Sequence, residues 1–81
     1  MKKVLRFTAT WCGPCKMLAA TLEGADLGLP IEVVDIDVLP EVARDFGVRG
    51  VPTLVMVDEN GAEIKRQVGL VSITQLQEWV K

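Results

Sequence analysis

The only two cysteines of this 81-residue chain, Cys12 and Cys15, lie three positions apart in the segment TWCGPCKML. Two residues at that spacing in the first turn of a helix have Cβ atoms about 5 to 6 Å apart, whereas a disulfide needs about 3.5 to 4.5 Å. A small adjustment at the start of the helix closes this gap; Gly13 gives the backbone freedom for it and Pro14 restricts that freedom. The pair is therefore suited to cycle between a dithiol and a disulfide.

The two sulfurs are not equivalent. Cys12 precedes the helix and is expected to be exposed, whereas Cys15 lies on the apolar face of the helix with Leu18. The positive end of the helix dipole stabilises a thiolate, which lowers the pKa of Cys12 below the value of about 8.5 of a free thiol. Cys12 is therefore the expected nucleophile and Cys15 the resolving thiol.

Other uses of a cysteine pair fit this composition less well. With two cysteines and no histidine, a tetrahedral zinc site needs carboxylates or a second chain. A permanent disulfide is a poor stabiliser in a reducing cytosol. We expect a cytoplasmic protein, because Arg6 interrupts the N-terminal apolar run, which matches neither a signal peptide nor a membrane span. These points predict a redox-active pair with no metal and no bound cofactor.

The charge distribution excludes two classes of partner. Nine basic and eleven acidic residues are spread along the chain and leave a formal net charge of -2, with no basic block. Nucleic acids and anionic membrane surfaces are bound by such basic blocks. We therefore expect neither a nucleic-acid partner nor a membrane partner.

The rest of the chain alternates between strand and helix patterns separated by short turns. β-Branched and apolar runs indicate strands, apolar residues at helical spacing indicate helices, and Gly, Pro and Asn mark the turns. The sequence predicts strands at 4–8, 31–37, 53–57 and 62–68, and helices at 14–23, 40–46 and from Ser72 onward. We expect these elements to form a single domain over residues 1–81.

Local signals support the ends of these elements. Pro14 suits the first turn of a helix, where a missing N–H costs nothing. Ser72 followed three residues later by Gln75 is the pattern of a capping box. The Asn60-Gly61 pair predicts a type I′ hairpin turn, because these residues readily adopt the positive φ angles that this turn requires.

The order βαβαββα predicts an α/β fold. The first βαβ unit is expected to be parallel with a right-handed crossover, and the hairpin adds two antiparallel strands. The result is a four-stranded mixed sheet with helices on both faces, in which Trp79 of the last helix belongs to the core. In such sheets the chemistry lies at the carboxyl ends of the parallel strands, where the turn that bears Cys12 is placed.

Three motifs, in this order and over almost the whole chain, resemble those of thioredoxins. They are WCGPCK at 11–16, VRGVPTL at 48–54, and NG at 60–61 followed by VGL at 68–70. The resemblance implies a thioredoxin-like fold and reduction of protein disulfides. The chain lacks the strand and helix with which full-length thioredoxins begin, so it is similar to glutaredoxins and to small thioredoxin-like proteins of archaea and phages.

The resemblance also implies roles for residues outside the cysteine pair. The Val51-Pro52 peptide bond is expected to be cis and to face the disulfide, so that the backbone of Val51 pairs with an extended substrate segment. An apolar docking surface is expected around Cys12; it comprises Trp11, Pro14, Val51, Pro52, Gly69 and Leu70. Core positions for Val51 and Leu70, and a strand end at Gly69, are the alternatives.

Arg6 departs from the family pattern. Six residues before the nucleophile, thioredoxins have a buried aspartate thought to move a proton to or from the resolving cysteine, and the lysine associated with it aligns with Val33. Neither half of that relay is present. Arg6 either packs its stem and directs its head to water, Asp35 or Asp37, or it stabilises a thiolate and raises the reduction potential of the pair.

We therefore predict a monomeric thiol-disulfide oxidoreductase that acts on disulfide-containing proteins. Electrons come from thioredoxin reductase or from glutathione. Within the enzyme class, an oxidant or isomerase and a glutaredoxin-like, glutathione-dependent reductase are alternatives. A thioredoxin-fold interaction module or subunit, whose disulfide serves only as a redox lock, is the alternative from another class.

Overall fold

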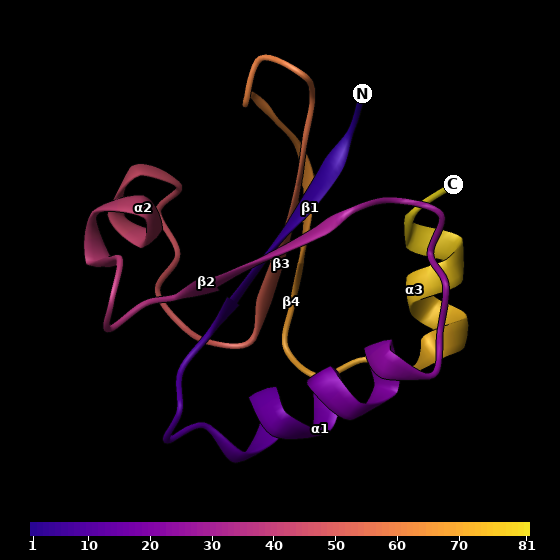
Figure 1. The fold of residues 1–81 in the computed structure, drawn as a ribbon, viewed down its shortest axis with the longest axis horizontal. Coiled ribbons are helices and arrows are strands. Elements are labelled where there is room, and N and C mark those ends of the chain that lie inside the picture. The colour runs from indigo at the N-terminus through magenta and orange to yellow at the C-terminus, as the bar shows by residue number, and fades with distance from the viewer.

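Four strands form one mixed sheet in the order β2-β1-β3-β4 (Figure 1), and the computed structural model describes all residues, 1–81. The elements follow the predicted order βαβαββα. They are β1 (Lys3–Thr8), α1 (Gly13–Glu23), β2 (Ile31–Asp35), α2 (Pro40–Asp45), β3 (Thr53–Val57), β4 (Glu63–Val68) and α3 (Ile73–Trp79). β1 is parallel to β2 and antiparallel to β3, and β3 is antiparallel to β4.

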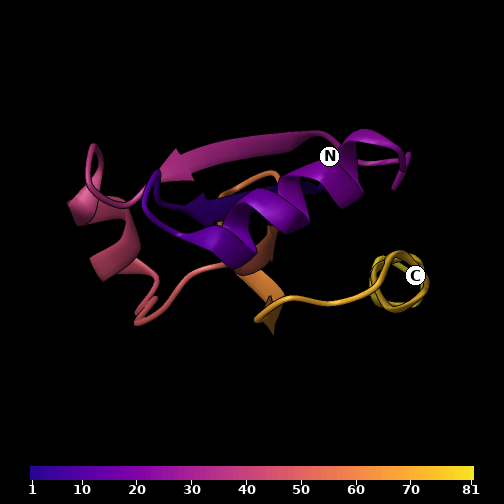
Figure 2. The same cartoon turned by 90° about the horizontal axis from the view of Figure 1, so that it is seen from below.

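Alternating side chains of β1 point to opposite faces of the sheet. Val4 belongs to a buried cluster that includes Leu18 of α1 and Leu76 of α3. Phe7 belongs to a second cluster that includes Ala43 of α2. Helices therefore cover both faces of the sheet, as predicted. In Figure 1, α2 lies on one side of the strands and α3 on the other, and Figure 2 shows the same separation from a second direction.

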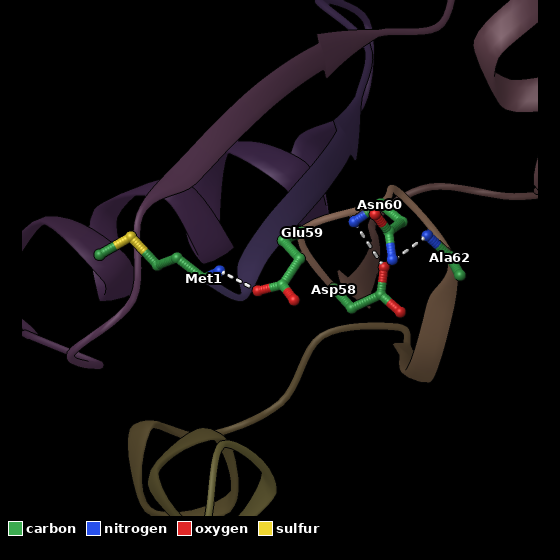
Figure 3. Close-up of polar contacts among 5 residues, drawn as sticks. All are labelled: Met1, Asp58, Glu59, Asn60 and Ala62. Atoms are coloured by element: carbon green, nitrogen blue, oxygen red, sulfur yellow. Dashed lines mark hydrogen bonds and ion pairs between the residues drawn. The ribbon is translucent and has the colours of Figure 1, made fainter.

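The turn between β3 and β4 is not the predicted type I′ turn. No residue other than glycine has a positive φ, and Gly61 has a φ of 83°. The Asp58 carboxylate accepts hydrogen bonds from the backbone N–H groups of Asn60 (2.8 Å) and Ala62 (3.0 Å) (Figure 3). The backbone of Asp58 also pairs with Gly61 and Ala62. This side chain stabilises a three-residue loop that ends in a left-handed glycine, so Asn60 needs no positive φ.

Two polar contacts join elements at the periphery of the sheet. The Met1 amine lies 2.7 Å from the Glu59 carboxylate (Figure 3), but both groups are exposed, so this ion pair contributes little to stability. Arg66 of β4 bonds to Glu63 and donates to the Phe46 carbonyl at 2.6 Å. The hydrogen bond that the Arg66 guanidinium donates to Glu63 lowers the pKa of the Glu63 carboxyl. Arg66 thus ties the outer strand to the end of α2.

Side-chain hydrogen bonds set the ends of two elements. The Asp35 carboxylate accepts from the backbone N–H of Asp37 at 2.9 Å, and β2 ends at Asp35 rather than at position 37. The predicted capping box of α3 is present, because Gln75 N–H donates to the Ser72 hydroxyl and Ser72 N–H donates to the Gln75 side chain. The chain has no helix long and apolar enough to cross a membrane.

Leu76 is the only fully buried side chain of α3. Trp79 also packs against the same cluster, but it is half-buried, and its indole N–H is buried without a hydrogen-bond partner. Lys65 of β4 lies 5.8 Å from the centre of the Trp79 ring. Attachment of α3 to the sheet therefore depends mainly on Leu76.

Replacing Leu76 by alanine is expected to lower the free energy of unfolding by about 2 to 5 kcal/mol, because it removes buried methyl groups and leaves a cavity. Urea denaturation followed by circular dichroism measures this change. Gln77→Ala, at the exposed neighbouring position, is the control and is expected to change the free energy of unfolding by less than about 0.5 kcal/mol. A loss of similar size in both variants would contradict the role given to Leu76.

Candidate active site

A disulfide joins Cys12 and Cys15 at the N-terminus of α1, with the two Cα atoms 5.2 Å apart. Cys12 is the N-cap of α1, and its Sγ accepts a hydrogen bond from the backbone N–H of Cys15 at 3.1 Å. Pro14 occupies the first turn, where no intrahelical N–H bond is lost. In the dithiol form, negative charge on this sulfur therefore lies at the positive end of the helix dipole.

The prediction that Cys12 is exposed was wrong. Only 4% of Cys12 and 1% of Cys15 is accessible to solvent. Ala9 and the partly buried Ile36 and Val51 pack against the pair, and the first two were not predicted to be part of the site. Both immediately follow the parallel strands β1 and β2 and so lie at the same edge of the sheet; their position after a strand is the signal that would have found them.

The Val51-Pro52 peptide bond is cis, as the resemblance implied. It places the carbonyl oxygen of Val51 3.8 Å from the Sγ of Cys12. The Thr53 hydroxyl donates to the carbonyl of Gly50 at 2.7 Å and thereby closes the turn around this segment. The backbone of Val51 is thus held directly beside the more accessible sulfur.

Gly69 and Leu70 follow β4 and lie next to the cis-proline segment. The backbone N–H of Gly69 donates to the Pro52 carbonyl at 2.9 Å, and Gly69 has a φ of 90°. A Cβ at this position would contact no other atom within 4 Å, so the backbone conformation, and not close packing within the chain, favours glycine here. Leu70 is 43% exposed, which excludes it from the core.

Trp11 is 67% exposed, yet its side chain is held in place. Its indole N–H donates a hydrogen bond of 2.9 Å to the carboxylate of Asp37. Sequence reasoning considered Asp37 only as a partner for Arg6. Because Asp37 follows β2 and Trp11 follows the adjacent strand β1, the parallel pairing of these strands could have indicated the contact.

Arg6 lies in the middle of β1, opposite Val33 of β2 and Leu54 of β3. Its side chain is partly buried and forms neither a hydrogen bond nor an ion pair. The two carboxylates considered as its partners bond elsewhere: Asp35 accepts from the backbone, and Asp37 accepts from the indole. The structure therefore contains no ion pair that would compensate the charge of Arg6.

The surroundings of the disulfide form no pocket. They consist of backbone and apolar side chains contributed by the β1–α1 turn, the loop after β2, the segment before β3 and the segment after β4. Nor does the structure contain a group of three or more side chains able to hold a metal ion. These segments leave both cysteines almost fully covered, with Cys12 slightly more exposed than Cys15.

The family model described as Thioredoxin matches residues 1–81. This chain belongs to the thioredoxin family.

Individual family members agree with this assignment. A thioredoxin of Chlamydia muridarum is 46% identical over 67 residues, which cover 79% of this chain and 65% of that protein. A bifunctional thioredoxin reductase/thioredoxin of Mycobacterium leprae is 43% identical over 67 residues, covering 78% of this chain and 14% of its own length. The solved structure of a mutant thioredoxin from Halobacterium salinarum NRC-1 superimposes with a TM-score of 0.88 at 33% identity, over 98% of this chain and 71% of that one. The predicted thioredoxin-like fold is confirmed, and the chain spans about 65% of the length of the chlamydial relative.

Replacing Asp37 by alanine is expected to release the indole of Trp11, because the hydrogen bond between them is lost. In a Trp79→Phe background, where Trp11 is the only tryptophan, the fluorescence anisotropy should fall and quenching by iodide should increase. Glu41→Ala removes an exposed carboxylate of α2 that makes no bond to Trp11, and it is the matched control. Unchanged anisotropy after the Asp37 substitution would mean that packing alone holds the indole.

Proposed function

We propose that this protein is a thiol-disulfide oxidoreductase that reduces disulfides in other proteins. The observation that carries this proposal is the Cys12–Cys15 disulfide at the start of α1, with the sulfur of Cys12 accepting the N–H of Cys15. Membership of the thioredoxin family supports it. The disulfide itself is the only redox group that the reaction requires.

The reaction is an exchange of disulfide bonds. The Cys12 thiolate attacks one sulfur of the substrate disulfide, which forms a mixed disulfide and releases the other substrate sulfur as a thiolate. The Cys15 thiolate then attacks the Sγ of Cys12, which breaks the mixed disulfide and releases the second substrate thiolate. Two electrons pass from the dithiol to the substrate, whose sulfurs take up protons. The Cα separation of 5.2 Å allows this second step without large backbone movement.

Substrate docking is assigned to the apolar surface around Cys12. Trp11, next to Cys12, and Leu70, next to the glycine that bonds to Pro52, are large exposed apolar side chains, and such exposure indicates an interaction surface. The Val51 backbone lies beside the sulfur and pairs with an extended substrate segment as a short added strand. The backbone conformation of this surface is set by Gly13, Pro14, Pro52 and Gly69. A surface without a pocket suits a protein segment better than a small ligand.

Thioredoxin reductase is the proposed electron donor. The relative from Mycobacterium leprae is named as both a thioredoxin reductase and a thioredoxin, which supports a flavin-dependent reductase over glutathione. The sequence shows no basic cluster arranged for the carboxylates of glutathione. We propose that the protein works in the cytoplasm as a monomer, with no cofactor other than its own disulfide.

The two cysteine variants test the proposed reaction. With dithiothreitol as reductant, the parent protein is expected to accelerate the reduction of insulin disulfides, and Cys12→Ser is expected to return the rate to that of dithiothreitol alone. Cys15→Ser, which retains the nucleophile but cannot resolve, is expected to accumulate mixed disulfides on Cys12 that mass spectrometry detects. A parent protein with no effect on the rate, together with no adducts on the Cys15 variant, would leave an interaction module as the better interpretation.

Leu70→Ser tests the docking surface. If a substrate covers this half-exposed side chain, losing its apolar surface weakens binding by about 1 kcal/mol, which corresponds to about a fivefold higher KM for a protein disulfide. The rate with a small disulfide such as hydroxyethyl disulfide should not change. Ile64→Ser, which alters a similarly exposed apolar residue on β4, is the control. Equal effects of the two substitutions on KM would contradict the assignment of Leu70.

A further inference from the structure

A partly buried arginine without a partner in the chain precedes the cysteine pair on the central strand. Arg6 lies in the middle of β1, the strand that is paired on both sides, and its guanidinium makes no ion pair or hydrogen bond within the chain. None of its nitrogen atoms is buried, so its stem packs against the sheet while its charge keeps contact with water. The reaction proposed above, on which this inference rests, creates an anion on the same side of the sheet.

Strand alternation directs Arg6 toward α1. Arg6 is two residues after Val4 and directly opposite Leu54, and both of these are fully buried in the cluster that contains Leu18 of α1. Residues two apart in a strand, and residues opposite each other in a pair, share one face of the sheet. The side chain of Arg6 therefore leaves the sheet on the face that α1 covers.

The contacts of β1 and α1 place Arg6 close to the resolving thiol. Val4 shares a cluster with Leu18, and Ala9, after the end of the strand, shares a cluster with Cys15. The helix thus runs back along the strand, and Arg6 lies between the two contacts, about 7 Å along the strand from Val4 and about 10 Å from Ala9. On the helix, Cys15 and Leu18 are about 4.5 Å apart along the axis. The side chain of Arg6 is long enough to span this short interval.

Few other charges face this region. On the same face of the sheet the only other charged residues are Asp35 of β2 and Lys65 of β4. The charged residues of the elements that pack on this face, and of the adjoining loop, are all exposed: Lys16, Glu23, Asp37 and Glu78. Asp35 accepts the backbone N–H of Asp37, and Lys65 lies over Trp79 on the outer strand β4. Of the two strand cations on this face, Arg6 is therefore the one on the central strand that leads to the cysteine pair, and Lys65 is on the outer strand.

We propose that Arg6 stabilises the thiolate of Cys15 by its fixed positive charge and thereby makes the Cys12–Cys15 pair a stronger oxidant. In the resolving step the proton of the Cys15 thiol goes to water, and no carboxylate acts as its base. The resulting thiolate attacks Cys12 Sγ and releases the substrate thiolate. Because the charge favours the thiolate, it favours the reduced state over the disulfide at any pH where the Cys15 thiol is ionised, and there it raises the reduction potential.

The test measures the thiol-disulfide equilibrium in glutathione buffers at several pH values, from pH 7 to a pH above the pKa of the Cys15 thiol. Parent and variant proteins are equilibrated with defined ratios of reduced and oxidised glutathione, alkylated, and their reduced fractions counted by mass spectrometry. Where the Cys15 thiol is ionised, Arg6→Gln is expected to stabilise the disulfide relative to the reduced form by roughly three- to thirtyfold, the range for one unit charge acting across a partly exposed site. Carbon-13 NMR titration of both cysteines is expected to show a higher pKa for the Cys15 thiol in this variant.

Matched variants separate charge from packing. Arg6→Lys keeps the charge, so its equilibrium constant with glutathione should stay within about threefold of the parent value. The same is expected of Lys65→Gln, which removes a cation from the same face of the sheet but beside Trp79. Arg6→Met removes the charge while keeping an apolar stem. It replaces Arg6→Gln in the comparison with the parent protein if the glutamine variant does not fold. Urea denaturation of each variant records the purely structural effect.

Two results would overturn the inference. One is an unchanged glutathione equilibrium and an unchanged Cys15 pKa in the neutral variants, with only their stability altered. The other is a shift in Arg6→Lys as large as that in Arg6→Gln, since shape and not charge would then be responsible. These are equilibrium measurements without turnover. A parent protein that titrates normally but reduces no protein disulfide would refute the proposed function and leave this result interpretable.

Discussion

The parallel pairing of β1 with β2 is the interaction on which the site depends. It brings the ends of two strands, and the residues Ala9 and Ile36 that follow them, to one edge of the sheet. The same pairing places Trp11 beside Asp37. Antiparallel pairing of β1 with β3 on its other side then brings the segment before β3 to that edge, so that the Val51 carbonyl meets the sulfur of Cys12. A single central strand thus assembles parts that are distant in sequence.

Burial and electrostatics act in opposite directions on the cysteine pair. Removing a thiolate from water disfavours the charged form, and both sulfurs are almost fully covered. The N–H of Cys15 and the positive end of α1 compensate this cost at Cys12. Cys15 lies deeper and within the helix, so it does not gain from a capping position. The charge proposed to act on it is that of Arg6, on the sheet face that α1 covers.

Much of this architecture was predictable because local sequence patterns determine it. Hydrophobic periodicity, the prolines at helix starts and the capping box at Ser72 gave every element in order. The element ends and the hairpin turn were less predictable, since side-chain acceptors such as Asp35 and Asp58 determine them. The wrong prediction that Cys12 is exposed has a different cause. Position before a helix suggests exposure, but the covering residues come from other strands, and local patterns do not report such contacts.

The partners of the site also explain why motif recognition alone describes it incompletely. Motif residues supply the sulfurs and the cis-proline backbone, but Asp37 holds the exposed Trp11 from 26 positions away. Arg6 is part of no motif, and its lack of a partner appears only when every carboxylate nearby is accounted for. For the proposed disulfide exchange, a cysteine pair that is nearly closed to solvent requires a partner that fits the surface around it. Selectivity would then arise from the shape and polarity around the disulfide, and the proposed charge effect of Arg6 would act on the redox equilibrium of the pair.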